Sequence, residues 1–524
     1  MDLSLSFWNW LLALSPLLVV VILMLGFRWG GSRAGGMGWI TAVLVAILFF
    51  GAGFDLLAVA QVKAALLSLD VLFIIWTALL LFNIAREAGA IRMIGRALPA
   101  LTGDKVMQSL LIGWIMVSFL QGMGGYGVPV AVCAPLLVGL GFSPIQAVVM
   151  ASIGHGWAVS FGSLATAFQT LMAVTGLSGE ALAPMAGLLL GIASLPSGLL
   201  VALIGTGWKG LKRAFFPVLL LSMVMGSAQY LLATNGLWTL GATGAGIAGL
   251  VVGFGLARLP KFRAKEAASD LEASPQEDKG KSLWLSLIAY GLLVVLAFAI
   301  NLIKPVDEFM SQVTFTLEFP EVSTAFGWVT EAGKGRVINL FGHTGAILLY
   351  TCVISYIIYR RVGYIEKGAL KRILGRVVKS GVNSSLGSLA MVGVASVMLH
   401  SGMTYLLAQG LSVSFSRDAY PAVAPFIGAL GAFITGSNTN SNVLFALLQE
   451  NAAKLMDLNV FLILGAQTAG GALGSVLAPA KVIVGCSTVG LGGKEGMVMR
   501  KLLGYGAVTI GVVALTALTI HHLF

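Results

Sequence analysis

The chain has 524 residues, of which 58% are apolar and only 10% are charged. Soluble globular domains are nearer half apolar and a quarter charged, so this composition excludes an ordinary soluble enzyme, a disordered regulator and a zinc module. The net charge of +11 would suggest a nucleic-acid partner in a soluble protein, but in a membrane protein Lys and Arg accumulate on the cytoplasmic side. We therefore expect a lipid bilayer and no nucleic acid around this chain.

Long apolar segments predict an all-α polytopic membrane protein with about 12 transmembrane helices. The first segment has no basic region before it and no small-residue cleavage site, so we expect it to stay as a helix and not to be removed as a signal peptide. The expected spans are 8–27, 38–54, 66–85, 144–172, 182–207, 214–233, 238–257, 283–303, 337–359, 382–411, 456–478 and 503–521.

Two further apolar stretches, 106–142 and 421–450, are interrupted near their centres. The first contains Gln121-Gly-Met-Gly-Gly-Tyr-Gly-Val-Pro129, and the second contains Thr435-Gly-Ser-Asn-Thr-Asn-Ser-Asn442. Glycine and proline destabilise helix interiors, and Ser and Asn side chains compete for backbone hydrogen bonds. We interpret both stretches as re-entrant hairpins, each of which returns to the side from which it entered.

The basic residues set the expected orientation and the division of the chain. With the N-terminus and the C-terminus outside, most of the 32 Lys and Arg residues fall in cytoplasmic loops. The polar stretch 258–282 is the expected cytoplasmic linker between a first half, 1–257, and a second half, 283–524. The external stretch 304–336 is expected to be a long loop without evident chemistry.

The two halves share a sequence pattern. Phe119-Leu-Gln-Gly122 precedes the first interruption, and Phe433-Ile-Thr-Gly436 precedes the second. Similar Gly-Ser pairs follow each hairpin, at Gly162-Ser163 and at Gly474-Ser475. Because the expected topology brings the two hairpins in from opposite sides, the halves are predicted to be inverted repeats. Inverted repeats with interrupted helices point to a transporter binding site near the midplane of the bilayer.

The interrupted segments can bind a small polar anion. Free N–H groups at helix N-termini favour anions, and glycines without side chains let a carboxylate approach the backbone, although the same glycines also suit close helix packing. The expected substrate-binding residues of the first hairpin are Gln121, Gly122, Gly124, Gly125, Tyr126 and Gly127. Those of the second hairpin are Ser437, Asn438, Thr439, Asn440, Ser441 and Asn442. Oxygen atoms near Ser437, Asn438 and Thr439 are also candidates for holding Na⁺.

Ionisable and polar residues inside apolar segments are costly and therefore functional candidates. Lys481 follows Pro479 in an apolar run and is expected to act as a counter-charge for a carboxylate or in place of a coupling cation, unless its ammonium reaches the cytoplasmic interface. His155, Gln467 and Asp70 are the candidates for ion coupling. For Asp70 an interfacial position near a helix end remains the alternative.

These motifs resemble the lactate permease family of bacterial secondary transporters. The similarity extends over nearly the whole chain and is densest at residues 121–129 and 435–445, with a further match at Val489-Gly-Leu-Gly-Gly-Lys-Glu495. The resemblance implies proton-coupled uptake of lactate or glycolate across the bacterial inner membrane. Ser437-Asn-Thr439 also resembles the hairpin tip of sodium-coupled carboxylate carriers that work by an elevator mechanism.

Three positions depart from the family. Its members usually have Glu at the position of Gln121, Asp at that of Asn438 and a small polar residue at that of Lys481. Gln and Asn cannot carry a proton. Either another residue carries it, His155 being the first candidate, or Na⁺ replaces it, or the substrate is more negative than lactate.

The sequence therefore predicts a symporter of a small organic anion, most simply a lactate- or glycolate-type 2-hydroxymonocarboxylate with H⁺. The alternatives are a Na⁺-coupled carrier of a related carboxylate or sulfonate and an anion channel. An enzyme is disfavoured because the chain lacks clustered carboxylates, a phosphate-binding loop and a nucleophile-turn motif. No cofactor is expected beyond the coupling ion, and a second copy of the chain remains a candidate partner.

Overall fold

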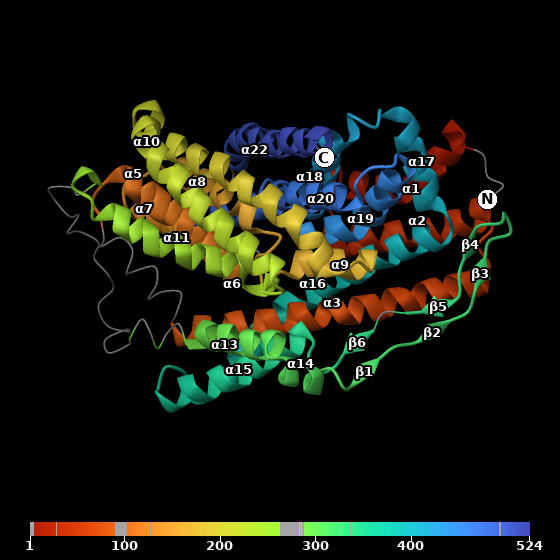
Figure 1. Ribbon diagram of the computed structural model, residues 1–524, viewed down its shortest axis with the longest axis horizontal. Helices are drawn as coiled ribbons and strands as arrows, with labels where there is room; N and C mark the ends of the chain where they lie inside the picture. The colour runs from red at the N-terminus through yellow and green to blue at the C-terminus, as the bar shows by residue number, and fades with distance from the viewer. Residues whose placement is uncertain are drawn as a thin grey trace.

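The computed structural model describes residues 5–27, 29–89, 102–125, 127–262, 282, 285, 288–335, 337–491 and 494–523. Helices dominate both halves (Figure 1). The helices of the first half are α1 (Phe7–Leu25), α2 (Gly31–Phe50), α3 (Phe54–Ala88), α5 (Lys105–Leu110), the π-helical turn η2 (Leu111–Met116), α6 (Val117–Met123), α7 (Val128–Gly139), α8 (Pro144–His155), the 3₁₀ turn η3 (Gly156–Ala158), α9 (Thr166–Thr175), α10 (Gly179–Thr234), η4 (Trp238–Leu240), α11 (Gly241–Ala257) and η5 (Pro260–Phe262).

The second half adds helices and a strand ladder. Its helices are α13 (Ile288–Leu302), α14 (Lys304–Met310), α15 (Thr344–Arg361), α16 (Ala369–His400), α17 (Met403–Ser414), α18 (Tyr420–Thr435), α19 (Asn438–Leu455), α20 (Val460–Ser475), α21 (Pro479–Thr488) and α22 (Glu495–Leu523). Its strands are β1 (Thr314–Phe315), β2 (Glu318–Phe319), β3 (Val322–Ser323), β4 (Val329–Thr330), β5 (Gly333–Lys334) and β6 (Ile338–Asn339).

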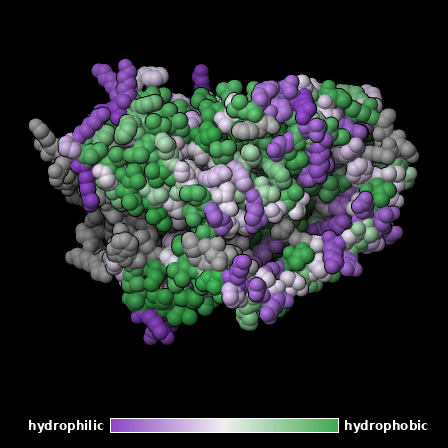
Figure 2. Space-filling model, viewed as in Figure 1, coloured by the Kyte–Doolittle hydropathy of each residue, from purple (hydrophilic) through white to green (hydrophobic). Residues whose placement is uncertain are grey.

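The described residues contain nine helical stretches that are long and apolar enough to cross a membrane. Hydrophobic side chains cover broad surfaces over α10 and α11 and over α13 and α15, while hydrophilic residues are more frequent in the right half of the view and at its left edge (Figure 2). Exposed Phe215, Phe216 and Val251 are part of that apolar surface. A multi-pass membrane protein is therefore confirmed, whereas the expected number of 12 spans and the orientation of the termini remain predictions.

Several expected spans differ from the helices that form. The expected span 144–172 is interrupted between α8 and α9. In the expected span 382–411, α16 ends at His400 and α17 begins after Gly402, whose φ is +84°. The spans 182–207 and 214–233 form α10, which is divided by a kink at Gly207, where φ is +67°. The expected loop 304–336 contains most of a ladder in which β1 pairs with β6, β2 with β5 and β3 with β4, all antiparallel. Most of the linker 258–282 lies outside the described residues.

Both interrupted stretches fold back as antiparallel hairpins. In hairpin one (α5 to α7), the Lys105 ammonium donates to the Leu140 carbonyl and closes the base. In hairpin two (α18 and α19), the Tyr420 hydroxyl donates to Gln449 Oε1 at 2.8 Å. The base of hairpin one lies toward one end of the molecule and the base of hairpin two toward the other, so their tips approach each other from opposite directions (Figure 1).

The helices pack in two layers. One layer combines α3, α13, α15 and the first part of α16, which share a separate apolar core (Figure 1). The other contains both hairpins together with α8–α11 and α20–α22, and its core also includes residues of α1, α2, α17, α3 and the last part of α16. Helices α3 and α16 run antiparallel, since Ser396 Oγ donates to the Ala60 carbonyl near one end and Trp76 Nε1 donates to Ser385 Oγ further along. The hairpin tips lie against this helical pair, because Gly124 approaches Phe82 of α3 and Ser388 of α16 donates to Asn440 at 3.4 Å.

Candidate functional site

The tips of both hairpins meet at a small buried cavity. It has a volume of about 60 Å³, which is room for a few water molecules. Two interrupted helices complete its wall, the α8–α9 segment and the α20–α21 segment. The lining residues are Gln121, Gly125, Val159, Gly162, Ser163, Thr166, Ala167, Gly436, Ser437, Asn438, Thr439 and Lys481. We call this space the hairpin cavity.

The α8–α9 interruption is held open by hairpin one. Ser163, Leu164 and Ala165 all have positive φ angles, between 49° and 58°, which is costly for residues with a Cβ. The Ser163 N–H donates to the Gln121 carbonyl at 2.6 Å, and the Leu164 N–H donates to the Gly122 carbonyl at 3.2 Å. These bonds satisfy backbone groups at both the interruption and the hairpin tip, which a buried irregular segment requires.

Three helix N-termini contribute to the wall of the hairpin cavity. Thr166 is the first residue of α9, Asn438 is the first residue of α19, and Lys481 lies in the first turn of α21. Gly436 adopts φ +74° and Ser437 caps α19 by accepting the Asn440 N–H, so the chain reverses just before α19 begins. Because a helix N-terminus carries partial positive charge, this arrangement favours an anion.

Lys481 is the one charged residue among those that line the hairpin cavity. Its ammonium donates to Ser475 Oγ, the last residue of α20, at 3.1 Å. A cation in the first turn of a helix is electrostatically unfavourable. An anion between Lys481 and the helix N-termini would relieve that repulsion.

Asn438 joins hairpin two to both interrupted helices. Its Nδ2 donates to Ser160 Oγ at 3.0 Å and to the Thr468 carbonyl at 3.2 Å. Asn442 Nδ2 donates to Thr468 Oγ1 and to the Ala167 carbonyl, both at 3.0 Å. The Oδ1 atoms of Asn438 and Asn442 are buried and have no hydrogen-bond partner among the described residues. Two such oxygens suit a hard cation such as Na⁺.

The other polar residues expected at the second hairpin are divided between packing and the cavity. Thr439 lines the hairpin cavity with Ser437. Asn440 Oδ1 accepts from Ser388 of α16 at 3.4 Å, and Ser441 Oγ donates to the Gly428 carbonyl at 2.7 Å within the hairpin. Asn440 and Ser441 therefore hold the hairpin in place and do not face the cavity.

The glycines of the first tip serve different purposes. A Cβ at Gly122 would lie 2.4 Å from Thr243 of α11, so Gly122 permits helix packing. A Cβ at Gly124 would lie 2.7 Å from Phe82 of α3, and one at Gly125 would lie 2.2 Å from Ser163 Oγ. Gly127, at φ +85°, allows the turn into α7. Gly125 alone among the four lines the hairpin cavity, and Tyr126 lies outside the described residues.

The three coupling candidates lie in different surroundings. His155 is buried at the end of α8, with Nδ1 2.7 Å from the Ala151 carbonyl and no partner for Nε2 among the described residues. Gln467 is buried in α20, and its Nε2 donates to Ser441 Oγ at 3.1 Å. Neither residue lines the hairpin cavity.

Asp70 belongs to the other helical layer. Its Oδ1 lies 2.7 Å from His343 Nε2, next to the start of α15. The Gly345 N–H donates to His343 Nδ1 at 3.0 Å, so Nε2 carries the imidazole proton and donates to Asp70. The carboxylate is buried, and it is not among the residues that line the hairpin cavity. The pair joins α15 to α3, and the coupling role of Asp70 stays a prediction.

Sequence reasoning missed part of the cavity wall. Val159, Thr166 and Ala167 line it, together with the Gly162-Ser163 pair. The matching Gly-Ser pairs of the two halves were the sequence feature that could have indicated this part of the wall, because both pairs lie where a helix is interrupted.

Comparisons with known proteins identify the family of the chain. The family model for L-lactate permease matches residues 9–524. An L-lactate permease of Halalkalibacterium halodurans is 26% identical, with 94% of this chain and 92% of that protein covered. The glycolate permease GlcA of Escherichia coli is also 26% identical, with 98% and 96% covered.

Among solved structures, the YdaH transporter of Alcanivorax borkumensis is similar at a TM-score of 0.46 and 14% identity, with 86% of this chain and 85% of that chain covered. The match of the family model over nearly the full chain indicates a transporter. The chain belongs to the L-lactate permease family.

Proposed function

We propose that this protein takes up a small 2-hydroxymonocarboxylate of the lactate or glycolate type, together with H⁺, across the bacterial inner membrane. The observation that carries the proposal is the hairpin cavity, in which one ammonium, Lys481, and three helix N-termini surround a small space. A carboxylate pairs with the positive groups, and the hydroxyls of Ser437 and Thr439 match the 2-hydroxyl. The printed names of the relatives, lactate and glycolate permeases, support the same class of substrate.

The two layers suggest how the anion is moved. The hairpins, the interrupted helices and their neighbours form the part that holds the substrate, and α3, α13, α15 and α16 form the part against which it moves. Rigid-body displacement of the first part exposes the cavity to each side in turn, as in alternating access around a fixed site. Because the hairpins reach the cavity from opposite ends, each tip closes one side.

Proton coupling is proposed to use His155. Its Nδ1 is engaged by the Ala151 carbonyl, and its Nε2 is the buried atom that is free to accept a proton. Sodium coupling is the second candidate, because the unpartnered Oδ1 atoms of Asn438 and Asn442 are suitable cation ligands.

Uptake by purified protein in liposomes tests these proposals. Radiolabelled L-lactate and glycolate are supplied under an inward H⁺ gradient or an inward Na⁺ gradient, with K⁺ replacing Na⁺ in the control. Proton symport predicts accumulation with the H⁺ gradient alone, and His155→Ala should remove the dependence on that gradient. Accumulation that requires Na⁺ and is lost in Asn442→Leu would support the sodium alternative. The absence of accumulation for both anions under either gradient would contradict the proposed function.

A further inference from the structure

A second, larger cavity lies between the two helical layers. It has a volume of about 360 Å³ and is walled by α3, α16 and the tip of hairpin one. Three of its lining residues, Arg86, Arg376 and Lys379, are basic, and none is acidic. We call this space the interlayer cavity.

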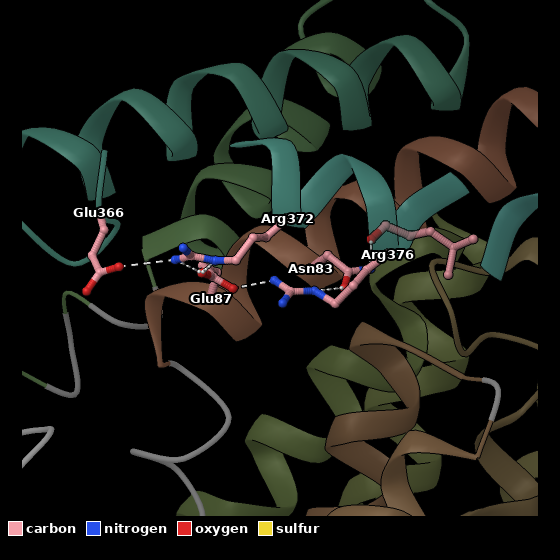
Figure 3. A network of polar contacts seen from close by, with 6 residues as sticks. Asn83, Glu87, Glu366, Arg372 and Arg376 are labelled. Carbon is pink, nitrogen blue, oxygen red and sulfur yellow. Dashed lines mark hydrogen bonds and ion pairs between the residues drawn. The ribbon is translucent and has the colours of Figure 1, made fainter. Parts of the chain in front are cut away.

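Arg376 is fixed in orientation by α3. Its Nε donates to Asn83 Oδ1 at 3.2 Å, and its Nη2 pairs with Glu87 (Figure 3). Asn83 is itself buried and tied to its own helix, because its Nδ2 donates to the Leu79 carbonyl at 2.8 Å. The guanidinium fork is therefore held at the cavity wall, which reduces the entropy lost when it binds a carboxylate.

The acid that orients Arg376 does not neutralise the cluster. Glu87 also accepts from Arg372 at 2.9 Å, and Arg372 contacts the exposed Glu366 at 3.2 Å (Figure 3). One partly buried carboxylate is thus shared between two arginines, while Arg86 and Lys379 add further positive charge at the same cavity. The interlayer cavity keeps a net positive field that attracts anions.

The interlayer cavity is next to the hairpin cavity. Gly125, Ser163 and Thr166 line both spaces. A carboxylate that leaves Lys481 past the tip of hairpin one therefore enters the space in front of Arg376.

We propose that the interlayer cavity is a second binding site for a small carboxylate, with Arg376 as the residue that pairs with it. The identity of that carboxylate as the transported anion rests on the proposed function. With two sites in sequence, an anion that leaves the Lys481 ammonium can pair with the Arg376 guanidinium. Its negative charge is then balanced by a positive side chain at both positions. The anion then has a defined position between the hairpin cavity and the solvent.

Thiol protection on the purified full-length protein tests the second site. Ser380 is exposed and lines the interlayer cavity, and the native Cys133, Cys352 and Cys486 are all buried. In the Ser380→Cys protein, a hydrophilic maleimide reports on occupancy, with L-lactate and glycolate as the protecting probes. Either anion should slow labelling in a saturable manner. Adding Arg376→Gln should raise the half-protecting concentration about tenfold, and Arg376→Lys should raise it less.

Two further variants separate direct occupancy from other causes. Arg372→Gln is the matched control, because Arg372 shares Glu87 but does not line the cavity, and it should leave the half-protecting concentration unchanged. Lys481→Met removes the charge of the hairpin cavity and should also leave it unchanged. Thermal melting of each variant verifies that it is folded.

Three results would overturn the second site: no protection by either anion, equal effects of Arg372→Gln and Arg376→Gln, or loss of protection in Lys481→Met. Loss of protection in Lys481→Met would mean that the labelling of Ser380→Cys follows a conformational change caused by binding in the hairpin cavity. Uptake in liposomes is measured in parallel, so a failure of the proposed function appears there and not in the labelling.

Discussion

Replacing Lys481 with methionine tests the electrostatics of the hairpin cavity. The change removes the one charge on the cavity wall and keeps most of the side-chain volume. A hydrogen bond to a charged group contributes about 1.5–3 kcal/mol, and about 1.4 kcal/mol corresponds to a tenfold change in an equilibrium constant. Lys481→Met should therefore weaken binding of L-lactate or glycolate in the hairpin cavity by about 10- to 100-fold, and Lys481→Arg should weaken it less.

The assay is equilibrium binding of the radiolabelled anion to purified protein, with uptake in liposomes as the second readout. Lys501→Met is the matched control, because Lys501 is an exposed lysine of α22 and its loss changes the net charge equally. Equal affinities in Lys481→Met and in the unmodified protein would refute the role assigned to the ammonium. Equal losses in both lysine variants would show that only the overall charge matters.

Three further changes give separate expectations. Gly125→Val drives a side chain into Ser163 and should abolish uptake while the protein remains folded, whereas its control Gly504→Val, which has open space around it, should be tolerated. Normal uptake by Gly125→Val would contradict the position of the cavity. Asp70→Asn weakens the bond to His343 and should lower the melting temperature without altering the pH dependence of uptake; an altered pH dependence would support a coupling role for Asp70. Thr468→Val removes an acceptor shared by Asn438 and Asn442 and should reduce the maximum uptake rate; an unchanged rate would show that this network is not needed.

The two hairpins were predictable because the residue types at their interruptions disfavour a continuous helix. Glycine and proline at 121–129 and the Ser/Asn cluster at 435–442 oppose a continuous helix on local grounds. The Gly436 turn and the Ser437 cap are local features of the same kind.

The interruption after α8 was not predictable in the same way. Leu164 and Ala165 favour helix, yet both have positive φ because the carbonyls of hairpin one accept the backbone N–H groups of Ser163 and Leu164. The acceptors are the carbonyls of Gln121 and Gly122, which lie far from residues 163–165 in the sequence. Tertiary contacts therefore override the local preference for helix. The strand ladder at 314–339 was missed for another reason, since its strands are only two residues long and mostly exposed.

The lining of the hairpin cavity was predictable in outline and not in detail. Lys481, which lines it, was a candidate from the sequence because a charge in an apolar run is unusual. Arg376 was not found, because it lies in a basic segment that the positive-inside rule already explains. The orientation of its guanidinium depends on Asn83 and Glu87, which reach it only through the antiparallel packing of α3 and α16.

The most direct test of the account is an experimental structure of the protein at saturating L-lactate or glycolate. The carboxylate should lie in the hairpin cavity, within hydrogen-bond distance of the Lys481 ammonium and at the start of α19. A structure in which no bound anion contacts Lys481 or the tips of the two hairpins would contradict the proposed site.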